Sequence, residues 1–358
     1  MDPERFLKTL TPPPTGVTHD SRKVQPGHVY VALKGEKHDG HDFIPDALSR
    51  GAAAVVGERP LSLEVPYLQV ESARRALSAL SAAFYGHPSK TLKVIGVTGT
   101  DGKTTTSHMI HYLLNALGTP TGLVSSVGYA FGNEWRFPEG HFTTPEAPEL
   151  QAVLAEFRDR GLTHAVVETS SHALAQHRVA DVDYDLAVWT HLTPEHLDFH
   201  GDMETYFQTK AGLVRKAGFG VLNAACPYAR RLFDLPHLSY GEGGDLRALN
   251  IEERPEGLRF TLQEGSRTLP VFLPMVGAYN VENALAALAA LKTLGHPLPE
   301  AAKALASFPG VPGRMQILAD RPVRLVVDFA HTPKALEKAL AALRPTTEGR
   351  LFVVVGAA

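Results

Sequence analysis

Short apolar runs alternate along most of the chain with longer stretches in which apolar residues recur every three or four positions. The short runs predict buried strands, and the longer stretches predict helices with one apolar face. We expect strands at residues 29–33, 53–56, 94–98, 165–167, 186–189, 220–222, 324–327 and 351–355. Helices are expected at residues 73–84, 109–117, 149–160, 280–294 and 334–343. Strands that alternate with helices imply an α/β fold, with a mainly parallel sheet covered by helices on both faces.

Two segments rich in proline and glycine, at residues 86–89 and 309–313, indicate linkers. They predict a small α/β domain at residues 1–88, a central domain at 91–310 and a last domain at 314–358. Residues 245–273 alternate between apolar and polar positions, which predicts an antiparallel excursion, and Asn280 is expected to cap the helix that follows. Two strands and one helix cannot close a core, so the last domain is expected to be incomplete or docked on the second.

Composition and charge narrow the classes of function. The 358 residues include 35 lysines and arginines against 38 aspartates and glutamates without a basic run, which argues against a nucleic-acid-binding surface. The single cysteine, Cys226, excludes an intramolecular disulfide and fits a reducing compartment. The N-terminus is charged where a signal peptide is apolar, and no apolar run approaches membrane-spanning length. We therefore expect a cytoplasmic protein that does not contact membranes.

The most informative stretch reads V-I-G-V-T-G-T-D-G-K-T-T-T, from Val94 to Thr106. A glycine-rich turn between a strand and a helix directs several backbone N–H groups at one point, where the helix dipole favours phosphate. Lys103 would contact the terminal phosphates and the Thr104 hydroxyl would bind Mg²⁺. Val97 stands where the usual P-loop has its first glycine, so this loop is expected to be shorter. The alternative is an ordinary glycine-rich turn.

Polar residues directly follow two of the predicted central strands. Glu168 begins the run E-T-S-S-H, and Thr190 begins the run T-H-L-T. Ligands of open α/β sheets bind at the carboxyl ends of the strands. The Glu168 carboxylate is a hard oxygen ligand suited to Mg²⁺, although an isolated carboxylate at a strand end is more often solvated.

Seven motifs together resemble those of the Mur ligases. They are V-T-G-T-D-G-K-T-T from Val97, F-T-T-P from Phe142, V-E-T-S-S-H-A-L-A-Q-H-R-V from Val167, L-T-P-E-H-L-D-F-H-G-D-M from Leu192, G-A-Y-N-V-E-N from Gly277, G-V-P-G-R-M from Gly310 and D-F-A-H-T-P from Asp328. They occur in the order found in that family and cover nearly the whole chain. The motif from Val167 and the motif from Leu192 resemble, more specifically, the branch that adds the third amino acid of the peptidoglycan stem peptide.

The resemblance implies a three-domain architecture. A central P-loop domain with a doubly wound, mainly parallel sheet would follow a small UDP-binding α/β domain and precede a Rossmann-like C-terminal domain, here truncated. It also implies that ATP phosphorylates a carboxylate of UDP-MurNAc-L-Ala-D-Glu and that the amine of a free diamino acid attacks the acyl phosphate. That amino acid would be meso-diaminopimelate, L-lysine or L-ornithine. The cofactors would be ATP and two Mg²⁺ ions, and the enzyme would be a monomer.

The resemblance also assigns residues to roles. The catalytic residues would be Lys103, Glu168, His196 and Lys210, and the metal ligands would be Thr104, Glu168, His196 and Lys210, the last as a carbamate formed with CO₂. ATP would contact Gly99, Thr100, Asp101, Gly102, Lys103, Thr104, Thr105, Asn280, Asn283, Arg314, Asp328 and His331. The UDP-linked substrate would contact Ser21, Thr143, Thr144, Ser170, Gln176 and Arg178.

Several of these residues have simpler interpretations. Lys210 on its own predicts a solvated lysine on a helix. His196 and His200 lie four apart, like zinc ligands on a helix, but no third ligand motif accompanies them, and His200 is also compatible with a structural role. Arg314 and Asp328 would otherwise form surface ion pairs.

Four positions depart from the family pattern, namely Asp101 and His191 in place of asparagine, Phe329 in place of tyrosine and Gln316 in place of glutamate. None of these changes removes a metal ligand. The Asp-Asn-Pro-Arg type motif that receives the amino acid is absent, so we expect a truncated chain that binds the UDP-substrate with little turnover.

Other functions remain open at this point. They are a Mur ligase that adds D-Ala-D-Ala, a folylpolyglutamate synthase, a P-loop kinase or ATPase, and a nucleotide and UDP-sugar binding module without turnover. The separate segment before the loop disfavours the folate enzyme.

Overall fold

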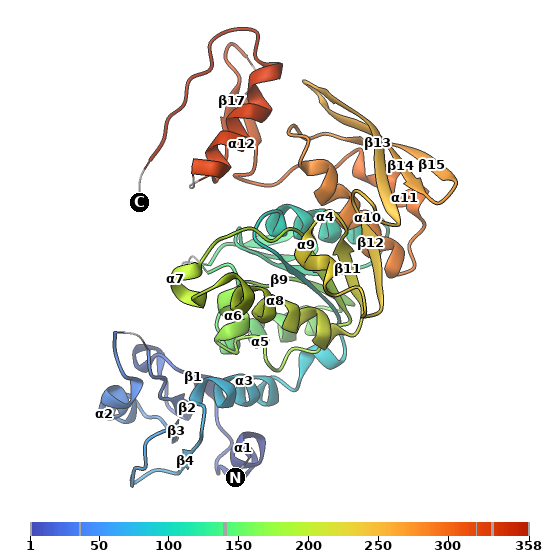
Figure 1. The fold of residues 1–358 in the computed structure, drawn as a ribbon. Coiled ribbons are helices and arrows are strands. Elements are labelled where there is room, and N and C mark those ends of the chain that lie inside the picture. The colour runs from blue at the N-terminus through green and yellow to red at the C-terminus, as the bar shows by residue number, and fades with distance from the viewer. Residues whose placement is uncertain (1, 36, 139–141, 320, 331–332, 357–358) are drawn as a thin grey trace.

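The structure is a computed structural model that describes residues 2–35, 37–138, 142–319, 321–330 and 333–356. Figure 1 shows three successive bodies, with the N-terminal segment in blue at one end, a large central sheet, and the C-terminal segment in red at the other end. The central sheet, which contains the predicted phosphate loop, therefore lies between the two smaller bodies.

The N-terminal body is built on a four-stranded parallel sheet in the order β1-β2-β3-β4. Its elements are α1 (Pro3–Thr9), β1 (Gly16–Thr18), β2 (His28–Val31), α2 (Ile44–Ser49), β3 (Ala54–Gly57), β4 (Tyr67–Gln69) and α3 (Ala73–Phe84), with short 3-10 helices at Ser21–Lys23, Gly40–Phe43 and Pro88–Lys90. Helix α3 has the predicted bounds, and Ser72 caps it by accepting a hydrogen bond from the Arg75 backbone N–H.

The central sheet has eleven strands in the order β15-β14-β13-β12-β11-β10-β5-β9-β6-β7-β8. These strands are β5 (Lys93–Thr98), β6 (Thr121–Val124), β7 (Tyr129–Phe131), β8 (Glu134–Arg136), β9 (His164–Glu168), β10 (Leu186–Trp189), β11 (Gly220–Asn223), β12 (His237–Tyr240), β13 (Leu246–Arg254), β14 (Gly257–Glu264) and β15 (Arg267–Leu273). The middle strands are parallel, whereas β7, β8, β14 and β15 pair in antiparallel fashion at the two edges. The predicted antiparallel excursion is confirmed.

Helices cover both faces of this sheet (Figure 1). They are α4 (Lys103–Ala116), α5 (Ala147–Asp159), α6 (Ser171–Ala175), α7 (Leu197–His200), α8 (Met203–Ala217), α9 (Pro227–Arg230), α10 (Asn280–Thr293) and α11 (Leu298–Leu305). Strand β10 shows the two-residue period of a covered sheet: Leu186 and Val188 pack with α4 and α10, whereas Ala187 and Trp189 pack with α5 and α8. The fully apolar strand is buried on both sides, as the sequence predicts.

Asn280 does not cap α10, contrary to the prediction. It is the first residue of the helix, and its buried Nδ2 donates to the Val276 carbonyl at 2.8 Å. Tyr279 occupies the cap position in a helical conformation and makes no capping bond with its side chain. The Asn280 amide is therefore held in the segment that enters the helix.

The C-terminal body contains the antiparallel pair β16 (Gln316–Ala319) and β17 (Leu325–Val327), then α12 (Pro333–Leu343) and a 3-10 helix at Arg344–Thr346. The strand predicted at residues 351–355 does not form: this segment has no regular secondary structure, Val354 is fully exposed, and no strand in the described part of the chain pairs with it. An apolar run becomes a strand only where a neighbour satisfies its backbone groups. The small core joins Met315, Ala339 and Ala342 to Val276 of the central body.

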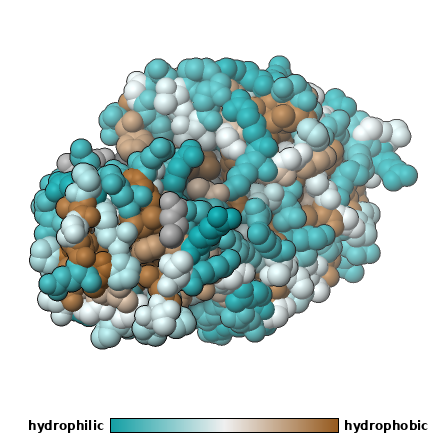
Figure 2. All heavy atoms as spheres, turned by 90° about the horizontal axis from the view of Figure 1, so that it is seen from below, coloured by the Kyte–Doolittle hydropathy of each residue, from teal (hydrophilic) through white to brown (hydrophobic). Residues whose placement is uncertain are grey.

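No helix among the described residues is long and apolar enough to cross a membrane. In the view of Figure 2, hydrophobic residues form small groups between hydrophilic ones. This face therefore carries a mixed surface.

Candidate functional site

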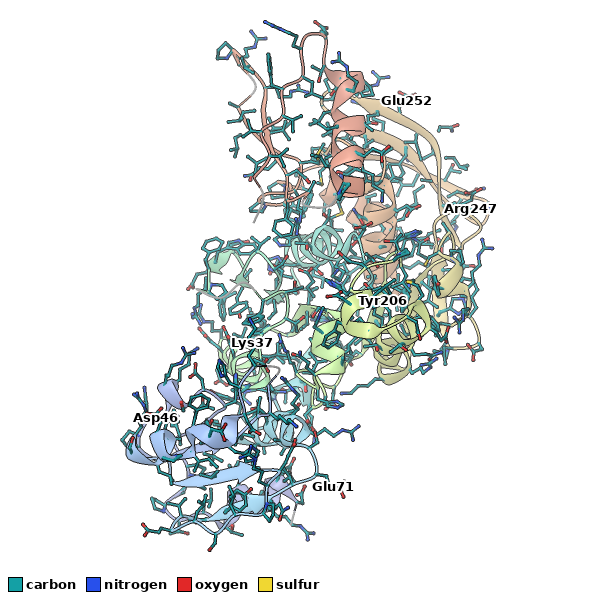
Figure 3. The ribbon with its side chains drawn as sticks, turned by 60° about the vertical axis from the view of Figure 1, so that its left-hand side comes forward. Lys37, Asp46, Glu71, Tyr206, Arg247 and Glu252 are labelled. Atoms are coloured by element: carbon teal, nitrogen blue, oxygen red, sulfur yellow. The ribbon has the colours of Figure 1, made fainter. Side chains whose placement is uncertain are left out.

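The phosphate loop connects β5 to α4 and is hydrogen-bonded to the segment that follows β10. Gly99 and Gly102 both have positive φ angles, of 143° and 84°. The Thr100 hydroxyl lies 3.1 Å from the Thr193 carbonyl oxygen and 3.1 Å from the Tyr206 hydroxyl, and it accepts from the Thr193 N–H at 3.0 Å. Figure 3 places Tyr206 within the central domain. The loop shape is therefore set before any ligand arrives.

Lys103 is the first residue of α4, and its side chain folds back over the loop. Its Nζ donates to the Gly99 carbonyl at 3.1 Å and to the Thr100 carbonyl at 2.8 Å. Thr105 is buried in the first turn of the same helix. The loop thus carries a cation at the helix N-terminus, where the dipole also favours an anion.

Thr104 and Glu168 meet at the carboxyl end of β9, next to the phosphate loop. The Thr104 hydroxyl donates to Glu168 Oε1 at 2.9 Å, and Glu168 Oε2 accepts from the Ser126 backbone N–H at 2.9 Å. Because Glu168 is only 1% exposed, the alternative of a solvated carboxylate is wrong. Mg²⁺ is usually bound through one or two carboxylates together with substrate phosphates, so these two oxygens suit a magnesium–nucleotide complex.

Lys210 lies in the core of the site, and the alternative of a solvated lysine is also wrong. Its side chain is 1% exposed, and its Nζ donates to the Gly99 carbonyl at 2.7 Å. Burial, followed by the nearby charge of Lys103, lowers the pKa of this amine well below its usual range. Helix α8 therefore delivers an amine, with its neutral form favoured, to the phosphate loop.

Three histidines gather beside Lys210. The His172 ring lies 4.7 Å from the His196 ring and 5.8 Å from the His200 ring, centroid to centroid. Burial lowers the pKa of His196 against the opposing charge of Glu195. Burial, and then the charge of His172, lowers the pKa of His200 to about 4. No group of three or more His, Cys, Asp or Glu side chains in the described residues forms a metal cage. His196 Nε2 lies 3.7 Å from Glu195 Oε2. The His196 backbone is in the left-handed conformation, directly before α7.

Four of the predicted substrate residues form one network next to Glu168. The Thr144 hydroxyl donates to the Glu168 carbonyl at 2.8 Å and accepts from the Ser170 N–H at 3.0 Å. Arg178 is 8% exposed and donates to the Thr144 carbonyl at 2.9 Å and to the Gln176 side chain at 2.6 Å. Thr143 is partly buried beside Thr144. The predicted substrate and metal residues are thus joined through the end of β9.

Asn280 and Asn283 lie side by side at the start of α10. Asn283 Nδ2 donates to Asn280 Oδ1 at 2.9 Å, and a side-chain carbon on Gly102 would come within 2.4 Å of Asn283 Oδ1. This approach places the asparagine pair against the phosphate loop, which the sequence separation concealed.

Neither Arg314 nor Asp328 forms an ion pair with another residue in the described part of the chain. Arg314 reaches the site, with Nη2 3.4 Å from the Thr104 hydroxyl and its guanidinium 4.3 Å from the centre of the Phe329 ring. The Asp328 carboxylate accepts from the backbone N–H groups of Met315 and Ala330, both at 2.8 Å. His331, predicted for the nucleotide site, lies outside the described residues.

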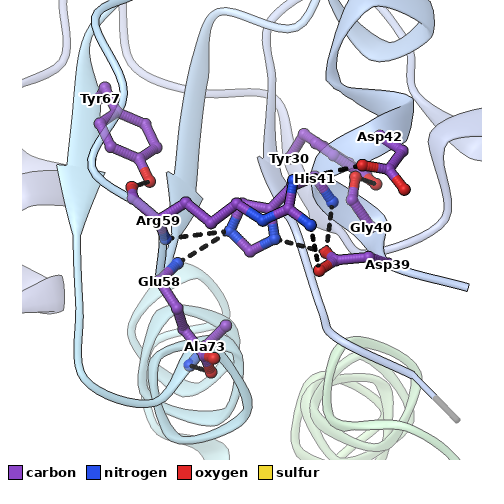
Figure 4. A network of polar contacts seen from close by, with 9 residues as sticks. All are labelled: Tyr30, Asp39, Gly40, His41, Asp42, Glu58, Arg59, Tyr67 and Ala73. Atoms are coloured by element: carbon purple, nitrogen blue, oxygen red, sulfur yellow. Dashed lines mark hydrogen bonds and ion pairs between the residues drawn. The ribbon is translucent and has the colours of Figure 1, made fainter.

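Ser21 lies in the N-terminal body, and no contact among the described residues joins it to the phosphate loop. It is buried in the 3-10 helix after β1. Nearby, the buried His41 orders a second loop: Nδ1 lies 2.6 Å from Asp39 Oδ1, and Nε2 accepts from the Glu58 N–H at 2.9 Å (Figure 4). In Figure 3, Lys37 of the same loop lies on the side of the N-terminal body that is nearest the central domain.

Sequence reasoning missed three residues that shape the site. Ser126 donates to Glu168 through its backbone, Tyr206 supports Thr100, and Lys338 of α12 lies 3.4 Å from Asp101 of the loop. Ser126 follows β6, so its place after a strand end was a usable signal. Tyr206 and Lys338 depend on packing between distant helices, for which the sequence carries no local sign.

Comparison with known proteins agrees with this arrangement. Residues 97–291 match the Mur ligase middle domain, residues 14–85 the Mur ligase family catalytic domain, and residues 313–358 the Mur ligase glutamate ligase domain. The chain is 49% identical over 356 residues to the UDP-N-acetylmuramyl-tripeptide synthetase of Deinococcus radiodurans, which covers 96% of this chain and 72% of that protein. It is 41% identical over 352 residues to the UDP-N-acetylmuramoyl-L-alanyl-D-glutamate--2,6-diaminopimelate ligase of Geobacillus thermodenitrificans, covering 94% of this chain and 72% of the relative.

Solved structures give the same result. A UDP-N-acetylmuramoyl-L-alanyl-D-glutamate--2,6-diaminopimelate ligase superposes with a TM-score of 0.80 at 29% identity, covering 93% of this chain and 71% of that chain. The MurF ligase of Thermotoga maritima in complex with ADP superposes with a TM-score of 0.69 at 25% identity, covering 92% and 74%. With matches of this extent along the whole chain, the protein belongs to the Mur ligase family.

Proposed function

We propose that this protein is an ATP-dependent ligase that adds the third amino acid to UDP-MurNAc-L-Ala-D-Glu in cytoplasmic peptidoglycan precursor synthesis. One observation carries the proposal: Glu168 bonds through its carboxylate to Thr104 of the phosphate loop and through its carbonyl to Thr144 of the Arg178 network. A single strand end therefore links a nucleotide site to a second polar site. A ligase needs this proximity, because the phosphoryl donor and the substrate carboxylate must be held in line.

The phosphate loop is the proposed ATP site. Lys103 would exchange its bonds to the Gly99 and Thr100 carbonyls for bonds to phosphate oxygens, which stabilises the charge that moves during transfer. Thr104 and Glu168 would hold Mg²⁺, which supplies charge neutralisation at the phosphates. Asn280 and Asn283 would contact the base, and Arg314 would add a second cation beside Thr104.

Lys210 is proposed to react with CO₂ and to serve, with His196, at a second Mg²⁺ site. Its neutral amine attacks the carbon of CO₂, so that a C–N bond forms while the π pair of one C=O bond moves to oxygen. The nitrogen then releases one proton to solvent, which leaves an anionic carbamate. Burial supports the first step because it favours the neutral, nucleophilic amine. Native mass spectrometry in CO₂-equilibrated buffer should show about 44 Da of added mass that Lys210→Met lacks, and a fully active enzyme without that mass would refute carbamylation.

The second polar site is proposed to hold the UDP-linked dipeptide. Arg178 carries a guanidinium group that suits a phosphate or a carboxylate, and its bonds to Thr144, Gln176 and Glu146 fix its position. Ser170 belongs to the same network through its bond to Thr144. Ser21 would contact the uridine end from the N-terminal domain. We further propose that the domains span residues 1–88, 91–310 and 314–358, and that the enzyme acts as a monomer without nucleic-acid or membrane partners.

The reaction class can be tested by trapping the acyl phosphate. The complete protein is incubated with ATP, Mg²⁺, UDP-MurNAc-L-Ala-D-Glu and hydroxylamine, and hydroxamate is measured by mass spectrometry. We expect hydroxamate only when both ATP and the UDP-dipeptide are present. Phosphate release that does not depend on the UDP-dipeptide would instead indicate a plain ATPase, and the ligase proposal would fail.

The identity of the third amino acid is tested in the same mixture without hydroxylamine. Meso-diaminopimelate, L-lysine and L-ornithine are offered singly, and the UDP-tripeptide is separated by chromatography. One of the three diamino acids is expected to give product in preference to the others. If D-Ala-D-Ala were the accepted nucleophile instead, the protein would belong to a different branch of the family.

A further inference from the structure

Helix α3 forms the contact between the N-terminal and central domains. Its Ala73 and Leu77 pack in the same hydrophobic core as Ala147, at the start of α5. The Ser78 hydroxyl of α3 accepts from the Asp181 backbone N–H at 3.1 Å. The first two turns of α3 are thus held beside the start of α5 and beside Asp181.

Arg74 lies in this first turn with an unsatisfied guanidinium. Its side chain is partly buried, and Nη1 has no hydrogen-bond partner among the described residues even though the atom is inaccessible to solvent. His19 Nδ1, after β1, is buried without a partner in the same way. A buried polar group left unpaired destabilises the folded chain, and a charged group does so more strongly. Arg74 and His19 lie close enough for their charges to interact, and two unpaired groups near each other indicate that a bound partner completes them.

The carboxylates nearest to these groups are already engaged. Glu146 lies 3.0 Å from Arg178 Nε, and Asp20 lies 2.8 Å from Arg22 Nη2. Burial, and then the opposing effects of Glu146 and Arg74, set the pKa of Arg178, which is lowered overall. Arg74 therefore lies close enough to Arg178 for the two charges to interact. Among the described residues, no carboxylate forms an ion pair with Arg74.

We propose that Arg74 binds the diphosphate of the UDP-linked substrate and that it acts together with Arg178 from the opposite side of the domain contact. This inference rests on the proposed function. A diphosphate offers several anionic oxygens, enough to bond two guanidinium groups at once. The position also fits: His19 lies two residues before Ser21, the proposed uridine contact, and Arg178 bonds to Thr144 near Glu168. The diphosphate of the substrate lies between its uridine and its peptide.

The test is calorimetric binding of UDP, UMP and uridine to the full chain and to Arg74→Gln and Arg74→Lys. Arg75→Gln is the matched control, since Arg75 is the exposed neighbour on the same turn. Loss of a charge-assisted bond predicts about ten- to a hundredfold weaker UDP binding in Arg74→Gln. The loss should be smaller in Arg74→Lys and for UMP, and uridine binding should stay within about twofold. Arg75→Gln should bind UDP as the unmodified chain does.

Two outcomes would overturn the inference. Unchanged UDP affinity in Arg74→Gln would show that the side chain does not contact the diphosphate. Equal weakening of UDP binding and uridine binding in Arg74→Gln would show that Arg74 supports only the packing of the domains. In that case the melting temperatures of Arg74→Gln and Arg74→Lys would also fall.

Turnover separates this inference from the proposed function. In the hydroxamate assay, Arg74→Gln should raise KM for UDP-MurNAc-L-Ala-D-Glu and leave kcat nearly unchanged. Hydroxamate formation with an unchanged KM would refute the role of Arg74 while the ligase proposal stands. Absence of hydroxamate with the complete unmodified protein would refute the ligase proposal, and the UDP and uridine affinities would still decide the role of Arg74.

Discussion

Gly99→Ala is the substitution that most directly tests the shape of the phosphate loop. Gly99 has a φ angle of 143°, and a side-chain carbon added there would lie 2.0 Å from the Thr190 hydroxyl and 2.9 Å from the His191 carbonyl oxygen. The Thr190 hydroxyl cannot move freely because it bonds to the Thr98 carbonyl at 3.1 Å and the Asp101 carbonyl at 2.7 Å. The methyl group therefore requires the loop itself to shift.

The expected cost has two parts. Backbone strain at this φ angle contributes about 1–3 kcal/mol. Overpacking against a fixed hydroxyl and a backbone carbonyl contributes about 1–3 kcal/mol more. The sum, roughly 2–6 kcal/mol, is concentrated in the loop that would hold the phosphates. We therefore expect ATP binding to weaken by at least about tenfold, which corresponds to about 1.4 kcal/mol.

Gly118→Ala provides the matched control. Gly118 also has a positive φ angle, of 78°, but nothing lies within 4 Å of the added carbon. Only backbone strain of about 1–2 kcal/mol applies there. Thermal unfolding and calorimetric titration with Mg²⁺-ATP should show a smaller loss of stability in Gly118→Ala, with ATP affinity within about twofold of the unmodified chain.

The reasoning would be refuted by either of two results. Gly99→Ala could bind Mg²⁺-ATP as tightly as the unmodified chain, in which case the loop geometry does not determine nucleotide binding. Gly99→Ala could also lose no more stability than Gly118→Ala, in which case the contact with Thr190 is relieved without cost.

Three further predictions follow from single side chains. Lys210→Met should keep or raise the melting temperature, because an apolar chain replaces a buried amine whose hydrogen bond goes to the Gly99 carbonyl. It should also reduce hydroxamate formation at least about a hundredfold, and retained activity would contradict the proposed role of Lys210. Asp101→Asn removes the 3.4 Å ion pair between Asp101, which is 56% exposed, and Lys338, which is 47% exposed, so the free energy of unfolding should change by less than about 1 kcal/mol. Affinity for ATP should rise at low salt because a negative charge leaves the loop, and weaker ATP binding would show that the carboxylate is needed. Burial, and then the charges of His111 and Arg314, lower the pKa of His108 from an ordinary 6.5 to about 3. Between these two pH values the unfolded chain binds more protons than the folded one, so the free energy of unfolding falls as the pH drops from 6.5 towards 3. His108→Gln should make the denaturant midpoint less sensitive to acid in this range, and an unchanged pH profile would be contrary evidence.

Much of the fold was accessible from the sequence because its signals are local. The run from 94 to 98, the glycines of the loop and the apolar spacing after Lys103 each depend on neighbours within a few residues. Helix α3 and strand β10 have the predicted bounds for the same reason. The motifs also identified the family, because each local pattern is preserved in order along the chain.

Burial and partnership were decided only by the tertiary structure. Lys210 belongs to a helix whose sequence gives no sign that its amine lies against Gly99, which is 111 residues away. Residues 351–355 are as apolar as a buried strand, yet they stay exposed because strand formation requires a hydrogen-bonded neighbour. Sequence pattern determines which local conformations are favourable, whereas the environment of a side chain depends on which distant elements the fold brings beside it.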